Sequence, residues 1–271
     1  QLDDLKLKVP TRILLEPEPK NTAPALTLGT IAAKETNPDS VLVVTPADHY
    51  VKDLDQFTQV MHEAIKAAQD KTIVTLGINP TRPDTGFGYI HYEGDGAVKN
   101  VLTFKEKPQL DAAKLMIEQG QHTWNGGMFI LQSKTWLNAI QQSNPEIHKT
   151  VLHAWQSKKS DKWFERPDSD LFKLSPSDSI DYAVMEKAKQ LKIDVKLVIL
   201  DAGWSDLGSF DALDDIECKD KDDNIFKGDV VSLNTKNTIA IASKKNVSLI
   251  GVENLIVIET ADSVLVANKD D

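Results

Sequence analysis

Short apolar runs alternate with helical patterns over the first part of this chain, and that alternation restricts the folds open to it. The residue pattern predicts strands at 12–15, 41–45 and 72–78. A capping asparagine and a nearby proline predict a helix over 22–37, and apolar side chains recur at i, i+3, i+4 and i+7 over 57–68. Strands and helices in this order predict an α/β protein with a parallel sheet and right-handed crossovers.

The second predicted strand leads directly to a candidate site residue. Residues 41–44 are all apolar and β-branched at three of the four positions, which is typical of a buried strand. Pro46 ends the run, because proline cannot donate a ladder hydrogen bond. Asp48 and His49 follow at once. Ligands bind beyond the carboxyl ends of strands in open α/β sheets, so Asp48 is a candidate ligand residue; a simple turn aspartate is the alternative, and we interpret His49 as structural.

A second acidic residue follows another apolar run. Asp206 lies in G-W-S-D-L-G-S-F, which comes after the predicted strand at 195–200. Small glycine and serine residues crowd this carboxylate, which is uncommon in a plain loop. Two strand-end carboxylates are able to hold one Mg²⁺, because this hard cation prefers oxygen ligands. We therefore expect Asp48 and Asp206 to converge on a shared Mg²⁺.

Two polar segments suit a ligand that carries hydroxyl groups and a phosphate. F-K-E-K-P, residues 104–108, is expected to place Glu106 and Lys107 on opposite sides of an extended segment. Glutamate accepts hydrogen bonds from sugar hydroxyls, and lysine binds phosphate. In W-N-G-G-M-F, Asn125 offers both a donor and an acceptor before a predicted strand. A solvated strand end and a turn are the respective alternatives.

A glycine-containing segment, D-T-G-F-G-Y-I, is the third candidate. Gly86 and Gly88 permit positive φ angles and a close approach of the backbone to a ligand. A tight turn that enters a strand would have the same pattern. Neither a P-loop nor a G-x-G-x-x-G motif is present in the sequence, so the usual nucleotide-binding loops are absent from it.

Composition excludes several classes of protein. The 271 residues carry a net charge of −10, which argues against a protein that binds nucleic acid. The single cysteine, Cys218, excludes an intrachain disulfide and is typical of a reducing compartment. The sequence has no apolar run that approaches the ~20 residues of a membrane span, so no membrane is expected as a partner. We therefore predict a cytoplasmic protein.

The remaining pattern up to residue 218 predicts mixed elements. A loop and a hairpin are expected over 79–109, and residues 158–170 are expected to form a charged surface loop. Helices are expected near 110–119, 134–142, 145–157 and 179–191, and strands near 127–131 and 195–200.

From residue 224 onward the pattern changes. Short apolar runs alternate with Asn or Asp turns, and helical spacing is absent. Stacked β-arches, as in a small β-helix, would bury such runs, and a sandwich-like cap is the alternative. We therefore divide the chain into domains at 1–218 and 219–271. Exposed strand edges in the second domain would favour a homodimer.

Seven segments taken together resemble those of the bacterial mannose-1-phosphate guanylyltransferases, or GDP-mannose pyrophosphorylases. They are, in order, L-L-E-P-E-P-K-N-T-A-P-A (14–25), V-V-T-P-A-D-H (43–49), T-G-F-G-Y-I (85–90), E-K-P (106–108), W-N-G-G-M-F (124–129), S-I-D-Y-A-V-M-E (179–186) and W-S-D-L-G-S-F (204–210). E-K-P is shared with other sugar-phosphate nucleotidyltransferases, whereas the conjunction of the segments is specific. The resemblance extends from about residue 14 to the end of the chain.

The resemblance implies an enzyme that joins GTP and mannose 1-phosphate to give GDP-mannose and pyrophosphate, with Mg²⁺ as cofactor. It implies a Rossmann-like nucleotidyltransferase domain with a mixed, mainly parallel sheet and a small C-terminal β-helix-like domain. By position, Asp48 and Asp206 would hold Mg²⁺, and Lys107 would contact the sugar phosphate. The residues implied against guanine are Glu16, Asn21, Thr22 and Ala23. Those implied around mannose are Gly86, Tyr89, Glu106 and Asn125.

The sequence departs from the family pattern at its start. The family's first strand and its triphosphate loop, G-G-x-G-x-R-L-W-P, are not in this sequence, and Lys20 stands where an arginine is usual. We therefore expect an N-terminal segment to be missing and this chain by itself to be a poor or inactive catalyst. Two alternatives stay open: another sugar-1-phosphate nucleotidyltransferase, or a non-catalytic regulatory subunit that binds a nucleotide sugar.

Overall fold

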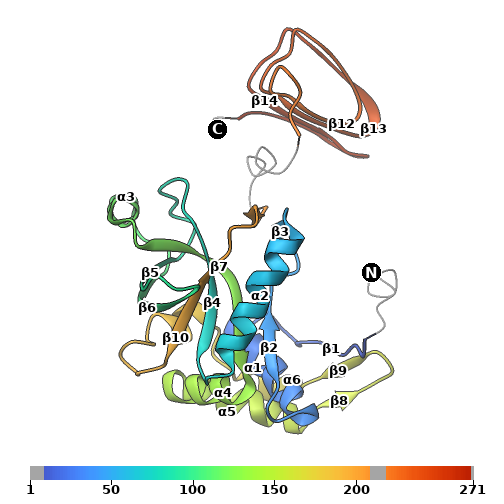
Figure 1. Ribbon diagram of the computed structural model, residues 1–271. Helices are drawn as coiled ribbons and strands as arrows, with labels where there is room; N and C mark the ends of the chain where they lie inside the picture. Colours follow the sequence, from blue (N-terminus) through green and yellow to red (C-terminus); the bar gives the residue numbers. More distant parts are fainter. Residues whose placement is uncertain (1–8, 208–217, 270–271) are drawn as a thin grey trace. The chain divides into compact units, whose positions relative to one another are not determined.

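The computed structural model describes residues 9–207 and 218–269. The chain divides into two compact units (Figure 1). Unit 1 comprises Gln1–Pro46 and Asp55–Asp201, and unit 2 comprises Ala47–Leu54 and Ala202–Asp271. The predicted domain boundary at 218/219 directly follows the undescribed residues 208–217 and stays a prediction.

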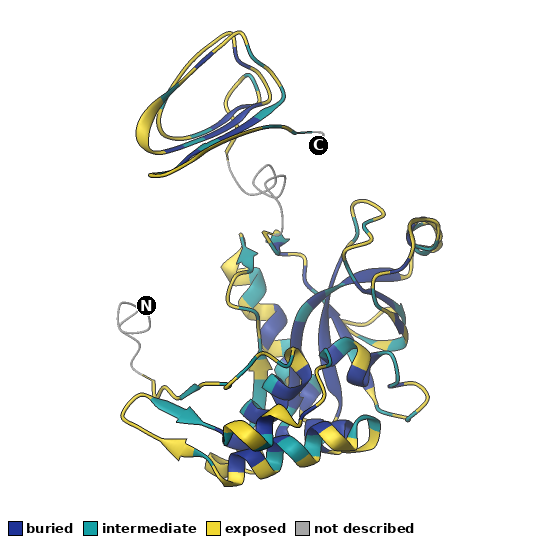
Figure 2. Ribbon diagram, turned by 180° about the vertical axis from the view of Figure 1, so that it is seen from behind, coloured by how far each residue is buried: buried dark blue, intermediate teal, exposed yellow. Residues whose placement is uncertain are grey.

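Unit 1 is built on a six-stranded mixed sheet with the order β2-β7-β4-β10-β6-β5. The strands are β2 (Val41–Val44), β4 (Ile73–Ile78), β5 (Tyr89–Glu93), β6 (Val98–Lys105), β7 (His122–Gln132) and β10 (Val195–Ile199). β4 and β10 pair in parallel, whereas the other neighbours in this order pair antiparallel. Every residue of β4 is buried, so this strand lies in the core of the unit (Figure 2).

The α/β class with a mixed sheet is confirmed, but the strands predicted at 12–15, 41–45 and 72–78 do not pair with one another in a parallel sheet. The long strand β7 lies between β2 and β4, so these two strands do not pair with each other. β1 (Ile13–Leu14) does not join the six-stranded sheet and pairs in parallel with β9 (Phe164–Arg166). Apolar periodicity predicts which segments are strands, but it carries little information about which strand each one pairs with.

Four helices pack together in unit 1: α1 (Thr22–Thr36), α4 (Ser133–Ser143), α5 (Pro145–Gln156) and α6 (Ser169–Lys173). Their apolar faces and strands of the sheet form one core, in which Trp136 and Trp155 are almost completely buried. α2 (Leu54–Ala68) and α3 (Leu110–Gln119) also lie where the spacing predicts them. The expected helix over 179–191 is shorter and of another type, since the structure has a π-helix at Asp181–Met185 followed by turns.

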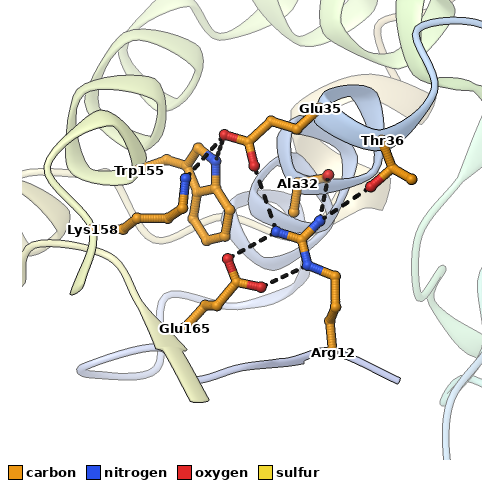
Figure 3. Close-up of polar contacts among 7 residues, drawn as sticks. All are labelled: Arg12, Ala32, Glu35, Thr36, Trp155, Lys158 and Glu165. Atoms are coloured by element: carbon orange, nitrogen blue, oxygen red, sulfur yellow. Dashed lines mark hydrogen bonds and ion pairs between the residues drawn. The ribbon is translucent and has the colours of Figure 1, made fainter. Parts of the chain in front are cut away.

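The predicted surface loop at 158–170 is wrong, because this segment contributes to a sheet. β8 (Lys159–Ser160) pairs with β9, and β9 pairs with β1. A polar network holds this sheet to α1 (Figure 3). Arg12 donates to both carboxylate oxygens of Glu165, at 2.6 and 2.8 Å, and to the Ala32 carbonyl oxygen at 2.8 Å. Such charge-assisted bidentate contacts are not visible in a charged sequence pattern.

Glu35 extends the same network to α5. Its Oε1 accepts hydrogen bonds from Trp155 Nε1 at 2.8 Å and from Lys158 Nζ at 3.0 Å (Figure 3). The Lys158 ammonium also lies 4.3 Å from the centre of the Trp155 ring, a cation–π distance. The network therefore joins the start of β1 to α1, α5 and β9.

Unit 2 contains a short two-stranded sheet between β3 (Tyr50–Val51) and β11 (Trp204–Ser205). Gly203 adopts a φ of +62°, and a Cβ there would lie 2.8 Å from the Cβ of Lys52. Both observations require glycine at this position. The backbone N–H of Lys52 donates to Ala202 and Gly203 carbonyl oxygens at 3.1 and 3.2 Å, which closes the pairing.

The rest of unit 2 is β-helical in its pairing. β12 (Ile225–Leu233), β13 (Ile239–Ile250) and β14 (Leu255–Glu259) pair in parallel, and β15 (Val264–Asn268) pairs antiparallel with β14. Asparagines stack at one corner, with Asn237 donating to Asn254 and Asn254 to Asn268, each at 2.9 Å. The expected β-arches are confirmed. Across the described part of the chain, no helix combines the length and apolar character of a membrane crossing.

Candidate active site

The two predicted metal-binding carboxylates lie on the paired segments of unit 2. Ser205 pairs with Tyr50, so Asp206 and His49 are the next residues in register. Burial lowers the pKa of His49 below its usual value, and the charges of Asp48 and Asp206 both oppose that shift. Because Asp48 directly precedes His49 and Asp206 is next to His49 in register, the fold brings Asp48 and Asp206 close to one residue from distant parts of the sequence. We call these two residues the aspartate pair.

His49 supports this arrangement as a structural residue. Trp204 Nε1 donates a hydrogen bond to His49 Nδ1 at 3.1 Å, and the two rings meet edge to face at 5.2 Å. Nδ1 is therefore an acceptor, which places the proton of the neutral ring on Nε2.

The aspartate pair fits a divalent cation that is completed by other oxygen ligands. The described residues contain no group of three or more His, Cys, Asp or Glu side chains that would hold a metal by themselves. Mg²⁺ is commonly held by one or two carboxylates together with water and substrate phosphates, rather than by a cage of protein ligands. Asp48 is exposed and Asp206 half-buried, so phosphate oxygens have access to the pair.

A second polar group lies in unit 1, around Asn125. This residue was expected before a strand, but it lies inside β7, at a shift in the β4–β7 register between Thr75 and Gly77. Such bulges change the direction in which a side chain points. Asn125 Nδ2 donates to Asp181 Oδ1 at 2.9 Å, and its Oδ1 accepts from Thr75 Oγ1 and Gly127 N, each at 3.2 Å.

Glu106 belongs to the same group. Burial, together with the nearby charges of Asp181 and Glu186, raises the pKa of Glu106 to about 7, although Lys107 opposes the shift. Its Oε2 is buried and has no hydrogen-bond partner among the described residues. An unpaired buried acceptor is costly, so this atom is suited to a ligand hydroxyl. We call Glu106, Lys107, Asn125, Asp181 and Glu186 the acid–amide cluster.

Lys107 was predicted on the opposite side of an extended segment from Glu106, and the structure differs. The segment bends directly after β6, and Lys107 adopts a φ of 43°. Burial raises the pKa of Asp181, and the positive charge of Lys107 opposes this shift. The charge of Lys107 therefore acts on both Glu106 and Asp181, and Lys107 is exposed.

Gly88 rather than Gly86 is the glycine that the cluster requires. A Cβ at Gly88 would lie 2.5 Å from Glu106 Oε2, whereas one at Gly86 would lie 3.1 Å from Asp84 Oδ1. Gly88 also accepts a hydrogen bond from the Asn125 backbone N–H at 2.7 Å. Tyr89, predicted to line the sugar pocket, has an almost completely buried ring whose hydroxyl donates to the Asp84 carbonyl oxygen at 3.0 Å. The Tyr89 side chain therefore contacts the backbone of the segment that contains Asp84.

The four residues implied against guanine do not share one surface. Glu16 lines a cavity of about 490 Å³ with residues of β9 and α6, and its Oε1 is buried and has no partner among the described residues. Burial raises the pKa of Glu16. That cavity is lined by Leu15, Glu16, Pro17, Lys159, Arg166, Pro167, Asp168, Ser169 and Asp170.

The other three residues stabilise the start of α1. Asn21 caps the helix, with a φ of 67°, and accepts from Thr22 N at 2.8 Å. The Thr22 hydroxyl accepts from Ile180 N at 2.9 Å. Ala23 is completely buried and its N–H donates to Asp178, so it presents no atom to a base in this structure. Its predicted contact with guanine stays a prediction.

Sequence reasoning assigned no role to Asp181, Glu186 and Thr75. The S-I-D-Y-A-V-M-E segment carried the only signal for the first two, because it holds two acidic residues five apart. In the structure, Asp181 begins the π-helix and Glu186 directly follows it. Glu186 Oε1 accepts from Glu106 N at 3.0 Å and from Lys105 Nζ at 3.3 Å. π-Helical turns occur frequently at functional sites. No local pattern distinguishes Thr75 from other strand residues.

The chain belongs to the nucleotidyl transferase family, because the sequence model of that family matches residues 1–223. Residues 228–271 match the MannoseP isomerase/GMP-like beta-helix domain. Both matches agree with the fold, and the resemblance inferred from the sequence motifs is confirmed.

Three known proteins illustrate the likeness. The chain is 41% identical over 270 residues to the xanthan biosynthesis protein XanB of Xanthomonas campestris pv. campestris strain B100, covering 100% of this chain and 56% of XanB. It is 40% identical over 266 residues to the mannose-1-phosphate guanylyltransferase of Salmonella montevideo, covering 95% of this chain and 55% of that protein. The chain thus spans about half the length of the curated relatives that it matches.

The third is a solved structure from Thermus thermophilus, named as a mannose-1-phosphate geranyltransferase, which is 33% identical with a TM-score of 0.85. The match covers 96% of this chain and 74% of that one.

Proposed function

We propose that this chain is the nucleotidyltransferase part of an enzyme that makes GDP-mannose and pyrophosphate from GTP and mannose 1-phosphate. The observation that carries the proposal is the acid–amide cluster of unit 1. It offers an unpaired buried carboxylate oxygen to hydroxyl groups and an exposed lysine to a phosphate. A hexose 1-phosphate has both kinds of group. The matched relatives named as guanylyltransferases support the assignment to mannose.

Glu16 supports guanine as the base. A carboxylate accepts hydrogen bonds only, and guanine presents adjacent N–H donors that suit the buried, unpartnered Oε1 of Glu16. A base that lacks these donors would leave the carboxylate oxygen unpaired, which is a strong source of discrimination. Asn21, Thr22 and Ala23 would contribute to base binding by holding the start of α1 in place.

We propose Mg²⁺ as the divalent metal, held by Asp48 and Asp206 together with substrate phosphate oxygens. When bound, it would polarise the α-phosphoryl group. The sugar-phosphate oxygen attacks the α-phosphorus of GTP in line, and the bond to pyrophosphate breaks. This nucleophile is anionic at neutral pH, so no general base is needed. The residues of the chain position the two substrates and neutralise charge, with Lys107 at the sugar phosphate.

A matrix of nucleoside triphosphates and sugar 1-phosphates, assayed with the full-length gene product, tests this function. We expect GTP with mannose 1-phosphate to give the highest kcat/KM. A preference for UTP or dTTP would overturn the guanylyl assignment and favour another sugar-1-phosphate nucleotidyltransferase. Binding of GDP-mannose without turnover would instead identify a non-catalytic subunit. Because GTP is the proposed substrate, we also propose the cytoplasm as the site of action.

We further propose a homodimer through the C-terminal β-domain. Three consecutive residues of β15 are exposed, Val264, Leu265 and Val266, at 62%, 44% and 61%. β15 is the last strand of its sheet in the described part of the chain, and an exposed apolar edge favours strand pairing. Light scattering on the full-length gene product should show a dimer that Val266→Lys weakens. A monomeric wild type would contradict this proposal.

A further inference from the structure

The amide of Asn125 has a defined orientation. If the side chain were flipped, its NH₂ group would face the N–H of Gly127 and its oxygen would face the Asp181 carboxylate. Both contacts would be repulsive, so the observed orientation is the only one that satisfies these partners. The Thr75 hydroxyl has a second acceptor, the Met128 carbonyl oxygen, but at the longer distance of 3.4 Å.

This orientation leaves Asn125 one unused hydrogen-bonding group. The amide oxygen already accepts two hydrogen bonds, and one N–H is directed to Asp181. An amide has two N–H donors, so the second N–H remains. Asn125 therefore acts toward a ligand as a donor, although the sequence alone allowed it to be donor or acceptor.

Asp181 is itself held in place. It is the first residue of the π-helix η1 (Asp181–Met185), and the preceding backbone N–H, of Ile180, donates to Thr22 Oγ1 at 2.9 Å. The backbone N–H of Tyr182 donates to Ser179 Oγ at 3.2 Å. These bonds hold the backbone on both sides of Asp181 and so fix the point from which its carboxylate reaches the Asn125 side chain.

We propose that Asp181 is a positioning residue of the sugar site. It orients the Asn125 amide so that the remaining N–H is donated to a hydroxyl oxygen of the sugar 1-phosphate, while the Glu106 carboxyl group accepts from a hydroxyl. This inference rests on the proposed function, because it assigns a sugar phosphate to the acid–amide cluster. Asp181 acts through Asn125 and need not contact the substrate.

Steady-state kinetics of the full-length gene product test the proposal. Asp181→Leu removes the acceptor at similar size, and we expect KM for mannose 1-phosphate to rise about 10-fold or more while kcat changes less than about 3-fold. Asp181→Asn keeps an acceptor oxygen and should stay within about 3-fold of wild type. In an Asn125→Ala background, Asp181→Leu should add less than about 2-fold, because its effect passes through Asn125. Additive effects, or a loss confined to kcat, would overturn the proposal.

A readout independent of turnover separates this proposal from the proposed function. In a ¹⁵N–¹H spectrum, the Asn125 side-chain N–H₂ signals should move in Asp181→Leu and much less in Asp181→Asn.

Thr75→Val, which removes the other side-chain partner of Asn125 at nearly equal size, provides a second variant if Asp181→Leu fails to fold. It should also move the Asn125 signals and raise KM. Unmoved Asn125 signals in the folded variants would overturn the positioning role even if the enzyme makes GDP-mannose. Moved signals in a protein without turnover would uphold the geometry and reject the function.

Discussion

The acid–amide cluster lies on β7, on η1 and on the residues that directly follow β6 and η1 in unit 1, whereas the aspartate pair lies just outside the two-residue strands β3 and β11 in unit 2. Within the cluster, Asn125 donates to Asp181 and the Glu106 backbone N–H donates to Glu186, and burial raises the pKa of Glu106 and Asp181. Asp48, by contrast, is exposed. The difference fits the two tasks that we propose for these regions. Distinguishing hydroxyl groups requires buried groups in fixed orientations, whereas binding a cation and phosphates requires accessible charge.

The largest expected effect tests the aspartate pair. Asp48→Asn or Asp206→Asn should lower kcat of the full-length enzyme by about 10³-fold or more, because charge neutralisation at the phosphates would be lost. The melting temperature should change little, since Asp48 is exposed. Asp201→Asn, an exposed carboxylate nearby in sequence, is the matched control and should retain activity. Equal losses of kcat in the control and in the test variants would show that the effect is not specific to the aspartate pair.

The next effect concerns the cluster. Gly88→Ala would place a Cβ 2.5 Å from Glu106 Oε2 and 2.9 Å from Phe104 Cζ. We expect KM for mannose 1-phosphate to rise about 10-fold and the free energy of unfolding to fall by about 1–2 kcal/mol, as in other overpacked sites. Gly96→Ala, whose added Cβ would make only an ordinary 3.6 Å contact, is the control. Kinetics and chemical denaturation measure both effects, and a harmless Gly88→Ala would contradict the tight packing inferred here.

A smaller effect should appear in the pH dependence of stability. The pKa of Glu106 is raised to about 7, so between pH 4.5 and 7 the folded protein binds more protons at this residue than the unfolded chain does. Stability should therefore fall as pH rises through this range. Glu106→Gln should remove this contribution, by at most about 1 kcal/mol because the group is partly exposed and screened. Denaturation at several pH values measures it, and an identical pH profile in the variant would show that the Glu106 carboxyl is not buried as described.

The smallest effect is expected in the Arg12 network, which shares no residue with either site region. Arg12→Ala should cost about 1 kcal/mol of stability, because the pair with Glu165 is partly exposed. The hydrogen bond from Arg12 lowers the pKa of Glu165, so this contribution is present above its ordinary value of 4.5 and is lost as pH falls through the lowered value. Wild type and variant should therefore converge in acid, and a difference that persists there would exclude the ion pair as its source.

Local patterns predicted the elements of this protein well. The regular apolar spacing at 57–68 corresponds to α2, and the apolar run at 72–78 to β4. The 158–170 segment was missed because its order depends on contacts with Arg12 and β1, more than a hundred residues away in the sequence. Asn125 was misplaced for a similar reason, since a bulge is defined by the partner strand.

The amino-acid sequence by itself determined the α/β class, the β-helical C-terminal segment and the candidate residues Asp48, Asp206, Glu106, Lys107 and Asn125, but not Asp181 or Glu186. These features follow from periodicity, turn residues and side-chain chemistry, which are local. Only the tertiary structure decided that β7 separates β2 from β4, that Asp206 lies in register beside His49, and that the Asn125 amide donates to Asp181. Pairing partners and hydrogen-bond directions depend on groups that are distant along the chain, and folding alone brings them within reach.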